Sequence, residues 1–179
     1  MKHLSLFLVL TCCTYTGHSA GDDSQLAQIY NFLRINDNLI SSGQVTAEQT
    51  QLLKPAGVKL VVNLATPDKA NDYADEAYLV TQQGISYLQI PVAWESPTFN
   101  DLDLFFTVMD ASQDHTVLVH CMANYRAAVF IYLYRTIRGH SEEATARAAL
   151  EQIWPAEAWT QYPQWSAFLE SAKKRPHSP

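Results

Sequence analysis

The sequence of 179 residues is poor in cysteine, glycine and basic side chains, and each shortage excludes a class of protein. Three cysteines cannot form the disulfide framework of a small secreted domain. Six glycines and eight prolines exclude collagen-like and low-complexity chains. Twelve Lys and Arg against eighteen Asp and Glu give a net charge of −6, which argues against nucleic acid as a partner.

The first 20 residues have the three-part composition of a secretory signal peptide. A short basic start is followed by a mostly apolar stretch, LSLFLVLTCC at 4–13, and then by small and polar residues. This stretch is too short to cross a bilayer, which takes about 20 apolar residues. We therefore expect residues 1–20 to be a signal peptide cleaved after Ser19 or Ala20, and an exported, periplasmic protein without a membrane span in the mature chain. Cys12 or Cys13 matches a lipid-attachment signal only weakly.

The remaining sequence predicts one domain at 21–172 and a flexible, solvated tail at 173–179. Strands are predicted at 38–42, 58–65, 86–91 and 116–120. Helices are predicted at 24–34, 46–54, 71–83, 98–111, 127–138, after Ser141, and at 162–173. Because strands alternate with helices, we expect an α/β fold with a mostly parallel central sheet flanked by helices. The aromatic residues at 154–165 are expected to pack helices, and the histidines lack the spacing of metal ligands, so we expect no metal site.

The segment TVLVHCMANYRAAVFI at 116–131 carries the strongest signal for chemistry. Cys121, the one cysteine left after signal cleavage, follows a buried strand, and Arg126 opens the next helix. The free amides and the dipole of a helix N-terminus bind anions, and this field favours a thiolate. The planar fork of an arginine suits two oxygens of a tetrahedral oxyanion. The alternative, an inert buried thiol beside a solvent-exposed arginine, leaves unexplained why a cation stands where the dipole disfavours it.

This segment resembles the active-site loop of cysteine-dependent phosphatases, which has the pattern His-Cys-x5-Arg between a strand and a helix. Three further segments, SGQ at 42–44, GVKLVVNLA at 57–65 and YLQIPV at 87–92, resemble bacterial phosphatase-like domains related to the dual-specificity phosphatases. That branch includes the β-lactamase-hydrolase-like phosphatase domains. The likeness runs from about residue 39 to residue 138 and implies a cysteine-phosphatase-like fold.

The resemblance also implies roles for individual residues. Cys121 would be the nucleophile, Arg126 would hold the phosphoryl oxygens, and no cofactor would be needed. The residues that would surround the substrate are His120, Met122, Ala123, Asn124 and Tyr125. His120 is expected to orient the loop and tune the thiol, and not to act as a base.

Three features depart from the family pattern. The spacing here is Cys-x4-Arg, which is the loop length of rhodaneses. The loop has no glycine, so Asn124 is the residue best able to adopt a positive φ. Ala127 and Ala128 stand where phosphatases carry a hydroxyl that stabilises the departing thiolate.

The general acid is the least determined part of the predicted site. In the family it is often an Asp on the loop after the Ile-Pro segment, and here that loop, VAWESP at 92–97, contains only Glu95 as a carboxylate. Glu95 is the first candidate and Asp101 the second, and a reaction without a dedicated acid is the third possibility.

Three functions fit these observations. The first is a metal-independent phosphatase of the tyrosine or dual-specificity type, hydrolysing a phosphorylated substrate of unknown class. The second is a rhodanese-like sulfurtransferase using a Cys121 persulfide, which the loop length favours. The third is a non-catalytic module that binds phosphate or another anion, which the absent hydroxyl and the undetermined acid favour.

Overall fold

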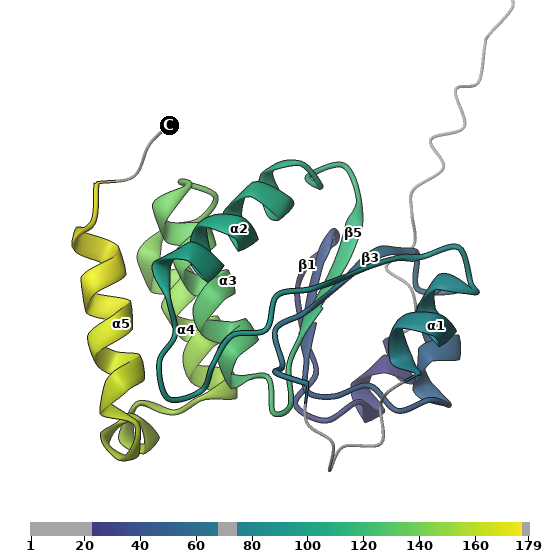
Figure 1. The fold of residues 1–179 in the computed structure, drawn as a ribbon, viewed down its shortest axis with the longest axis horizontal. Coiled ribbons are helices and arrows are strands. Elements are labelled where there is room, and N and C mark those ends of the chain that lie inside the picture. The colour runs from purple at the N-terminus through teal and green to yellow at the C-terminus, as the bar shows by residue number, and fades with distance from the viewer. Residues whose placement is uncertain (1–22, 68–74, 177–179) are drawn as a thin grey trace, which may run out of the picture.

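The computed structural model of the chain describes residues 23–67 and 75–176 (Figure 1). Its centre is a five-stranded sheet in the order β1-β2-β5-β3-β4. The strands are β1 (Leu33–Asn36), β2 (Leu39–Ser42), β3 (Val58–Asn63), β4 (Ser86–Gln89) and β5 (Thr116–His120). Strands β2, β5, β3 and β4 run parallel and β1 runs antiparallel at one edge, which confirms the mostly parallel sheet. The predicted signal peptide lies outside the described residues.

Helices cover both faces of the sheet (Figure 1). The helices on one face are α2 (Phe99–Asp110), α3 (Tyr125–Ile137), α4 (Glu143–Ile153) and α5 (Pro163–Lys174). The opposite face carries α1 (Glu76–Thr81) with two short 3₁₀ turns, η1 (Leu26–Gln28) and η2 (Gln49–Leu52). A third turn, η3 (Ala156–Gln161), joins α4 to α5. The predicted helix at 71–83 is shorter in the structure, although residues 71–74 lie outside the described part.

The central strand β5 is buried on both faces. Val117 and Val119 belong to the core under α2–α5, whereas Leu118, pointing the other way, belongs to the core under α1. This alternation follows from the period of two along a strand. The apolar run therefore places the residue after β5, Cys121, at the carboxyl edge of a sheet covered on both sides.

The expected helix at 24–34 is wrong. Only η1 forms there, and residues from Leu33 on make the edge strand β1, which pairs Leu33 with Ser41 of β2. Pairing with β2 satisfies the backbone groups that a helix would have satisfied internally, so the tertiary partner overrides the local helical pattern. The predicted helix at 46–54 is a single 3₁₀ turn, η2. Its capping box forms as predicted, with reciprocal bonds between Thr46 and Gln49.

The predicted start of a flexible tail at residue 173 is also wrong. Helix α5 continues through Lys174, and the Lys173 ammonium lies 2.5 Å from a carboxylate oxygen of Glu143. Arg175 donates two hydrogen bonds of 2.8 Å to Asp103 and stacks on Phe99. Carboxylates on α2 and α4 thus pair with the basic run, and residues 177–179 lie outside the described part.

The aromatic residues near the end of the chain pack helices, as predicted. Trp154 and Trp165 are fully buried, and both contact Trp94 from the loop between β4 and α2, with ring centroids 5.7 and 5.3 Å from it. These contacts fix the loop that follows β4 against α4 and α5.

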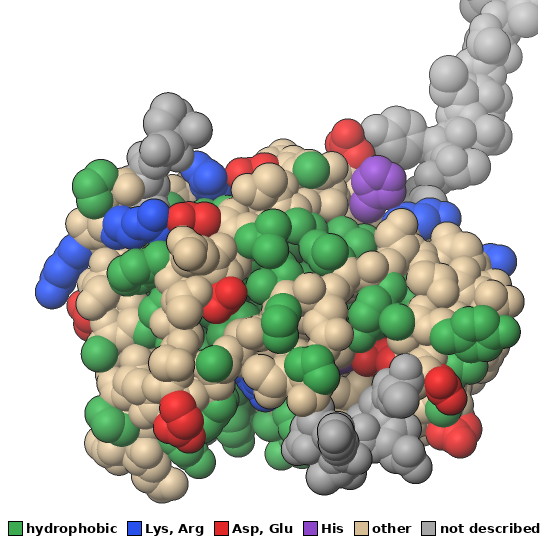
Figure 2. All heavy atoms as spheres, in the orientation of Figure 1, with side chains coloured by type: hydrophobic (Ala, Val, Ile, Leu, Met, Phe, Trp, Pro, Cys, Tyr) green, Lys and Arg blue, Asp and Glu red, His purple; other side chains and the backbone are tan. Residues whose placement is uncertain are grey.

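The face of the molecule drawn in Figure 2 carries no large patch of charges of one sign. Figure 2 shows hydrophobic side chains in the middle of this face and charges of both signs around them. Within the described residues, no helix is long and apolar enough to cross a membrane. The same residues contain no group of three or more His, Cys, Asp and Glu side chains that could hold a metal ion.

Candidate active site

The predicted loop joins the end of β5 to the start of α3, at the carboxyl edge of the sheet. Cys121 is its first residue, is 1% exposed, and donates its backbone N–H to the Ser42 carbonyl of the neighbouring strand. Helix α3 begins at Tyr125, so the loop meets the free amides of the helix N-terminus. The structure therefore places Cys121 where ligands bind in parallel sheets.

Asn124 adopts the left-handed conformation that the glycine-free loop requires, with φ of 67°, as predicted. Its side chain is completely buried and does not cap the helix. Instead, its amide group donates to the backbone carbonyl of Asn31 at 2.6 Å and to the Ser41 hydroxyl at 3.0 Å. Asparagine tolerates this backbone conformation better than most residues, which explains its place here.

The loop carbonyls are tied outward to the segments around it. The Met122 carbonyl accepts from the Gln44 backbone N–H at 3.1 Å, and the Ala123 carbonyl accepts from the Asn31 side chain at 3.0 Å. Because a trans peptide is planar, its N–H points opposite to its C=O. The amides of Ala123 and Asn124 therefore point away from Gln44 and Asn31, and are free to face a bound anion.

Gly43 is required by the close approach of three segments beneath the loop. A Cβ atom at this position would lie 2.8 Å from the Tyr30 ring and 3.1 Å from the Met122 carbonyl. The Gly43 N–H donates to the Tyr30 carbonyl at 2.7 Å. Any larger residue would separate Tyr30 from the loop, which gives a physical reason for the glycine in the SGQ segment.

Arg126 turns inward and is only 8% exposed, so it is not the solvent-facing arginine of the alternative interpretation. One terminal nitrogen donates to the Val92 carbonyl at 2.9 Å and to the Leu64 carbonyl at 3.4 Å. The guanidinium carbon lies 5.8 Å from the centre of the Trp94 ring, within cation–π range. Its buried Nε has no partner among residues 23–67 and 75–176, so this N–H is available to a ligand oxygen.

The two candidate acids lie outside this constellation. Glu95 follows Trp94 in the loop between β4 and α2, is exposed, and accepts a bond of 3.3 Å from Gln164 of α5. Asp101 lies in the first turn of α2 and accepts from the Thr98 hydroxyl at 2.7 Å. Asp101 therefore belongs to a helix cap, and Glu95 lies one residue from the aromatic partner of Arg126.

A buried carboxylate lies behind His120, and sequence reasoning missed it. Glu76 of α1 is 5% exposed, and its Oε1 lies 3.2 Å from His120 Nε2, without the alignment of a hydrogen bond. Its Oε2 accepts from the Asn63 amide and the Tyr87 hydroxyl. Burial lowers the pKa of His120, while the Glu76 carboxylate and a bond to the Cys121 backbone oppose this shift. Burial and the same carboxylate raise the pKa of Tyr87.

The lowered pKa of His120 predicts a loss of stability on mild acidification. Below pH 6.5 the histidine is protonated in the unfolded state but stays neutral in the folded state. The unfolded state therefore binds more protons. The free energy of unfolding should therefore fall as the pH drops from 6.5 to 5, by up to about 1.4 kcal/mol per pH unit from this group. Urea unfolding at half-unit steps in this range measures the slope.

His120→Asn supplies the control for this slope. The variant keeps a buried polar side chain but has no group that titrates near neutrality. The slope of its free energy of unfolding against pH should be smaller than that of the wild type. The difference should be at most the contribution of one proton, about 1.4 kcal/mol per pH unit. Parallel curves for the two proteins would show that His120 does not resist protonation.

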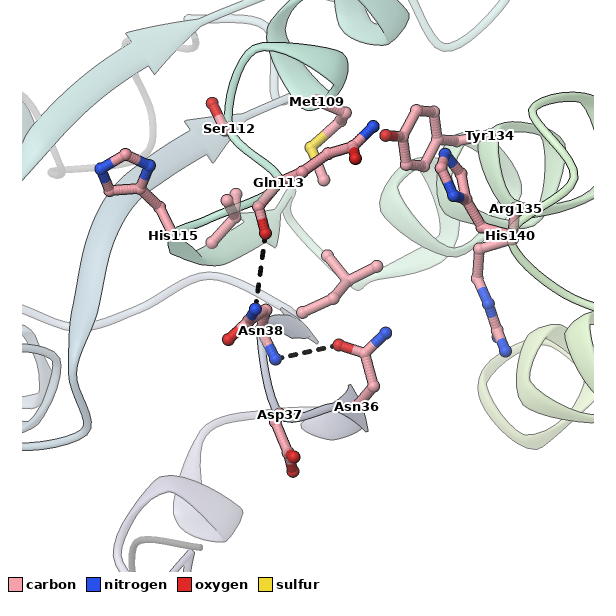
Figure 3. Close-up of a pocket in the computed structure, with 12 residues that line it drawn as sticks. Asn36, Asp37, Asn38, Met109, Ser112, Gln113, His115, Tyr134, Arg135 and His140 are labelled. Atoms are coloured by element: carbon pink, nitrogen blue, oxygen red, sulfur yellow. Dashed lines mark hydrogen bonds between the residues drawn. The ribbon is translucent and has the colours of Figure 1, made fainter. Parts of the chain in front are cut away.

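A cavity lies at the other end of β5 (Figure 3). It measures about 400 Å³. In Figure 3, Asn38, from the β1–β2 turn, bonds the Gln113 carbonyl beyond α2, and Tyr134 lies beside His140. The residues lining it include none of the predicted site residues. This cavity is therefore separate from the predicted site.

Sequence reasoning missed residues that surround the predicted site, among them Asn31 on the loop, Trp94 on Arg126 and Glu76 on His120. Each reaches the site from a segment distant in sequence, and none lies in a pattern that marks a ligand. Only the flanking SGQ segment hinted that the chain near residue 43 approaches the loop.

The fold is that of the cysteine-dependent phosphatases. A candidate phosphatase (DUF442) from Shewanella putrefaciens CN-32 is 39% identical, with 87% of this chain and 99% of that chain covered and a TM-score of 0.74. TpbA from P. aeruginosa is 21% identical over 79% of this chain and 84% of its own, with a TM-score of 0.61. Tk-PTP in its active form is 15% identical over 82% and 98%, with a TM-score of 0.65.

A family model described as a DSP-PTPase phosphatase fused to NAD+ kinase matches residues 27–161. The chain belongs to this family, and it is a phosphatase of the cysteine-dependent class. Among the curated proteins, none matches the chain.

Proposed function

We propose that the protein hydrolyses phosphomonoesters through a cysteinyl-phosphate on Cys121, without a metal ion. The observation that carries this proposal is the inward, buried Arg126, whose Nε has no partner in the described part of the chain. A buried unpaired donor costs free energy unless a ligand satisfies it. A phosphoryl oxygen bound beside the amides of the loop would supply that partner.

In the first step the Cys121 thiolate attacks phosphorus, and the bond from phosphorus to the ester oxygen breaks. Arg126 and the amides of Ala123 and Asn124 hold the equatorial oxygens, on which negative charge gathers. Glu95 gives its proton to the departing alkoxide, for which its side chain leaves Gln164. The alcohol departs, and the phosphoryl group remains on sulfur.

In the second step water attacks the cysteinyl-phosphate. Glu95, now a carboxylate, takes the proton of that water, and the sulfur–phosphorus bond breaks to release inorganic phosphate and the thiolate. Ala127 and Ala128 are both buried and offer no hydroxyl to the departing sulfur. Hydrolysis of the intermediate is therefore the slower step of this proposal.

The proposal is tested by hydrolysis of p-nitrophenyl phosphate in the presence of reductant and EDTA. We expect turnover that EDTA leaves unchanged and that iodoacetamide abolishes as one carboxamidomethyl group appears on the Cys121 peptide. Inorganic phosphate should protect both the activity and the thiol. Loss of turnover in EDTA, with restoration by a divalent metal, would contradict the proposal.

The role of Glu95 is tested by the leaving group. Glu95→Gln should lower kcat/KM for phenyl phosphate, whose leaving oxygen needs a proton in the first step, by about 10²-fold or more. The kcat/KM for p-nitrophenyl phosphate, which has a far better leaving group, should fall much less. Asp101→Asn is the control and should behave like the wild type. Equal falls in kcat/KM for both substrates would exclude Glu95 as the acid of the first step.

Sulfur transfer is the second candidate, because the loop has the four-residue spacing of rhodaneses. A Cys121 thiolate would take the outer sulfur of thiosulfate, releasing sulfite and leaving a persulfide on the enzyme. Mass spectrometry after thiosulfate treatment should show no stable gain of one sulfur if the phosphatase proposal holds. Phosphate protection without turnover on any phosphomonoester would instead favour the anion-binding module.

We also propose that the mature protein is exported and periplasmic, starting after Ser19 or Ala20. The three-part composition of residues 1–20 supports this. N-terminal sequencing of the protein from the periplasmic fraction tests it, and a chain that keeps its first 20 residues in the cytoplasm would contradict it.

A further inference from the structure

Asn31 forms two hydrogen bonds with adjacent residues of the loop. The Asn31 side chain donates to the Ala123 carbonyl at 3.0 Å, and the Asn124 side chain donates to the Asn31 carbonyl at 2.6 Å. Asn31 and Asn124 have φ of 49° and 67°, and within the described part of the chain they are the non-glycine residues with positive φ. Two such backbones linked by these bonds indicate that Asn31 holds the loop, because these conformations persist only where the surroundings fix them.

We propose that Asn31 is a positioning residue for the anion-binding loop, and that its side chain holds the amide of Asn124 toward the phosphoryl group. This inference rests on the proposed function. The bond from Asn31 fixes the carbonyl of Ala123, and the planar peptide then fixes the Asn124 N–H on the opposite side. Asn31 touches the loop from outside and does not touch the substrate.

The short loop explains why such a clamp is needed. Four residues separate Cys121 from Arg126, and none is glycine, so fewer amides are available to hold an anion. If one backbone N–H no longer points at the anion, this loop therefore loses a larger share of its anion affinity than a longer loop would. A hydrogen bond to the adjoining carbonyl prevents rotation of the peptide between Ala123 and Asn124.

Asn31 is itself held firmly by the residues before it. Leu26 and Ile29 are buried in the core beneath α1. Asp23 pairs with Arg34 through two bonds of 2.6 Å. The Tyr30 carbonyl accepts from the Gly43 N–H. This bond holds the residue before Asn31 in place beside the loop. The segment 23–31 thus acts as a rigid support outside the sheet.

The test compares Asn31→Gly, Asn31→Ala and the wild type. Glycine accepts the positive φ without strain but lacks the donor, whereas alanine loses both. The readout is the concentration of inorganic phosphate that half-protects Cys121 from iodoacetamide, which requires no turnover. We expect this concentration to rise about three- to tenfold in both variants, the range of one net hydrogen bond. KM for p-nitrophenyl phosphate should rise by a similar factor.

Asn38→Ala is the matched control. Asn38 is exposed at the far end of the sheet, and its side chain also donates to a backbone carbonyl, that of Gln113. Phosphate protection and KM should stay at the wild-type value in this variant. Thermal unfolding of all four proteins separates a loss of fold from a loss of loop geometry.

The outcomes distinguish this inference from the proposed function. If phosphate protects the wild type and Asn31→Gly equally, the clamp is overturned while the proposed function stands. A defect in Asn31→Ala alone would assign the effect to backbone strain, and would also overturn the clamp. If phosphate does not protect the wild type at all, the proposed function fails, and the clamp fails with it.

Discussion

Cys121→Ser should abolish hydrolysis of phosphomonoesters while leaving phosphate binding intact. Serine has nearly the same shape as cysteine, but its hydroxyl is not ionised near neutral pH and makes a far weaker nucleophile. Removal of the nucleophile of a covalent mechanism costs about 10⁴-fold or more in kcat. The loop amides and Arg126 remain, so the affinity for inorganic phosphate, measured by calorimetry, should stay within a few-fold of the wild type.

The control for this result applies to the chain that still carries residues 1–20. In that chain Cys12→Ser with Cys13→Ser keeps the predicted nucleophile and should keep full turnover, whereas the predicted mature protein lacks both residues. Residual turnover above a few per cent in Cys121→Ser would point to chemistry that does not use this thiol. Loss of phosphate binding together with turnover would instead indicate that the variant has disturbed the loop.

Arg126→Ala should lower kcat/KM by at least about 10²- to 10³-fold, which is the cost of removing a donor to transition-state charge. Arg126→Lys should recover only part of this loss, because an ammonium keeps the charge but lacks the planar fork of parallel N–H groups that matches two oxygens of one phosphoryl group. Both variants should also bind inorganic phosphate more weakly. Steady-state kinetics and calorimetry on the same preparations measure the two effects.

Arg126 also has a structural role, which the experiment must separate from its chemical role. Its removal takes the Arg126 donor from the Val92 carbonyl, whereas the Leu64 carbonyl still accepts from the Val92 N–H, and the cost is about 1–3 kcal/mol in the free energy of unfolding. Lysine retains one donor and should lose less stability than alanine. Arg135→Ala, at the other end of α3, removes a bond to Ser141 and should leave kcat/KM unchanged. Equal kcat/KM in Arg126→Ala and Arg135→Ala would exclude Arg126 from the reaction.

Local signals in the sequence predicted the main parts of the fold. The apolar runs at 58–65 and 116–120 predicted strands, and both lie in the middle of a parallel sheet. The stripe at 98–111 predicted α2, where Leu102, Phe105, Phe106 and Met109 are buried. These predictions succeed because burial on one face imposes a period that is visible in a few residues.

The predictions that failed concern segments whose partners lie outside the segment itself. Residues 24–34 have apolar spacing typical of a helix, yet Leu33 onward pairs with β2 as an edge strand. Lys173 and Arg175 have the composition of a solvated tail, yet Glu143 and Asp103 pair with them. The composition of a segment carries no information about pairing residues outside it. It therefore cannot predict the structure that such pairing produces.

By itself, the sequence determined which residues lie at the centre of the predicted site. A strand, one cysteine, a short loop and an arginine opening a helix are contiguous, so their relative positions follow from backbone geometry. The positive φ of Asn124 followed in the same way from the absence of glycine in the loop. Only the tertiary structure decided how the site is supported: Asn31 on the loop carbonyl, Glu76 behind His120, and Trp94 over Arg126. Each of these contacts joins residues at least 30 positions apart, and folding brings them together by burying apolar surface elsewhere.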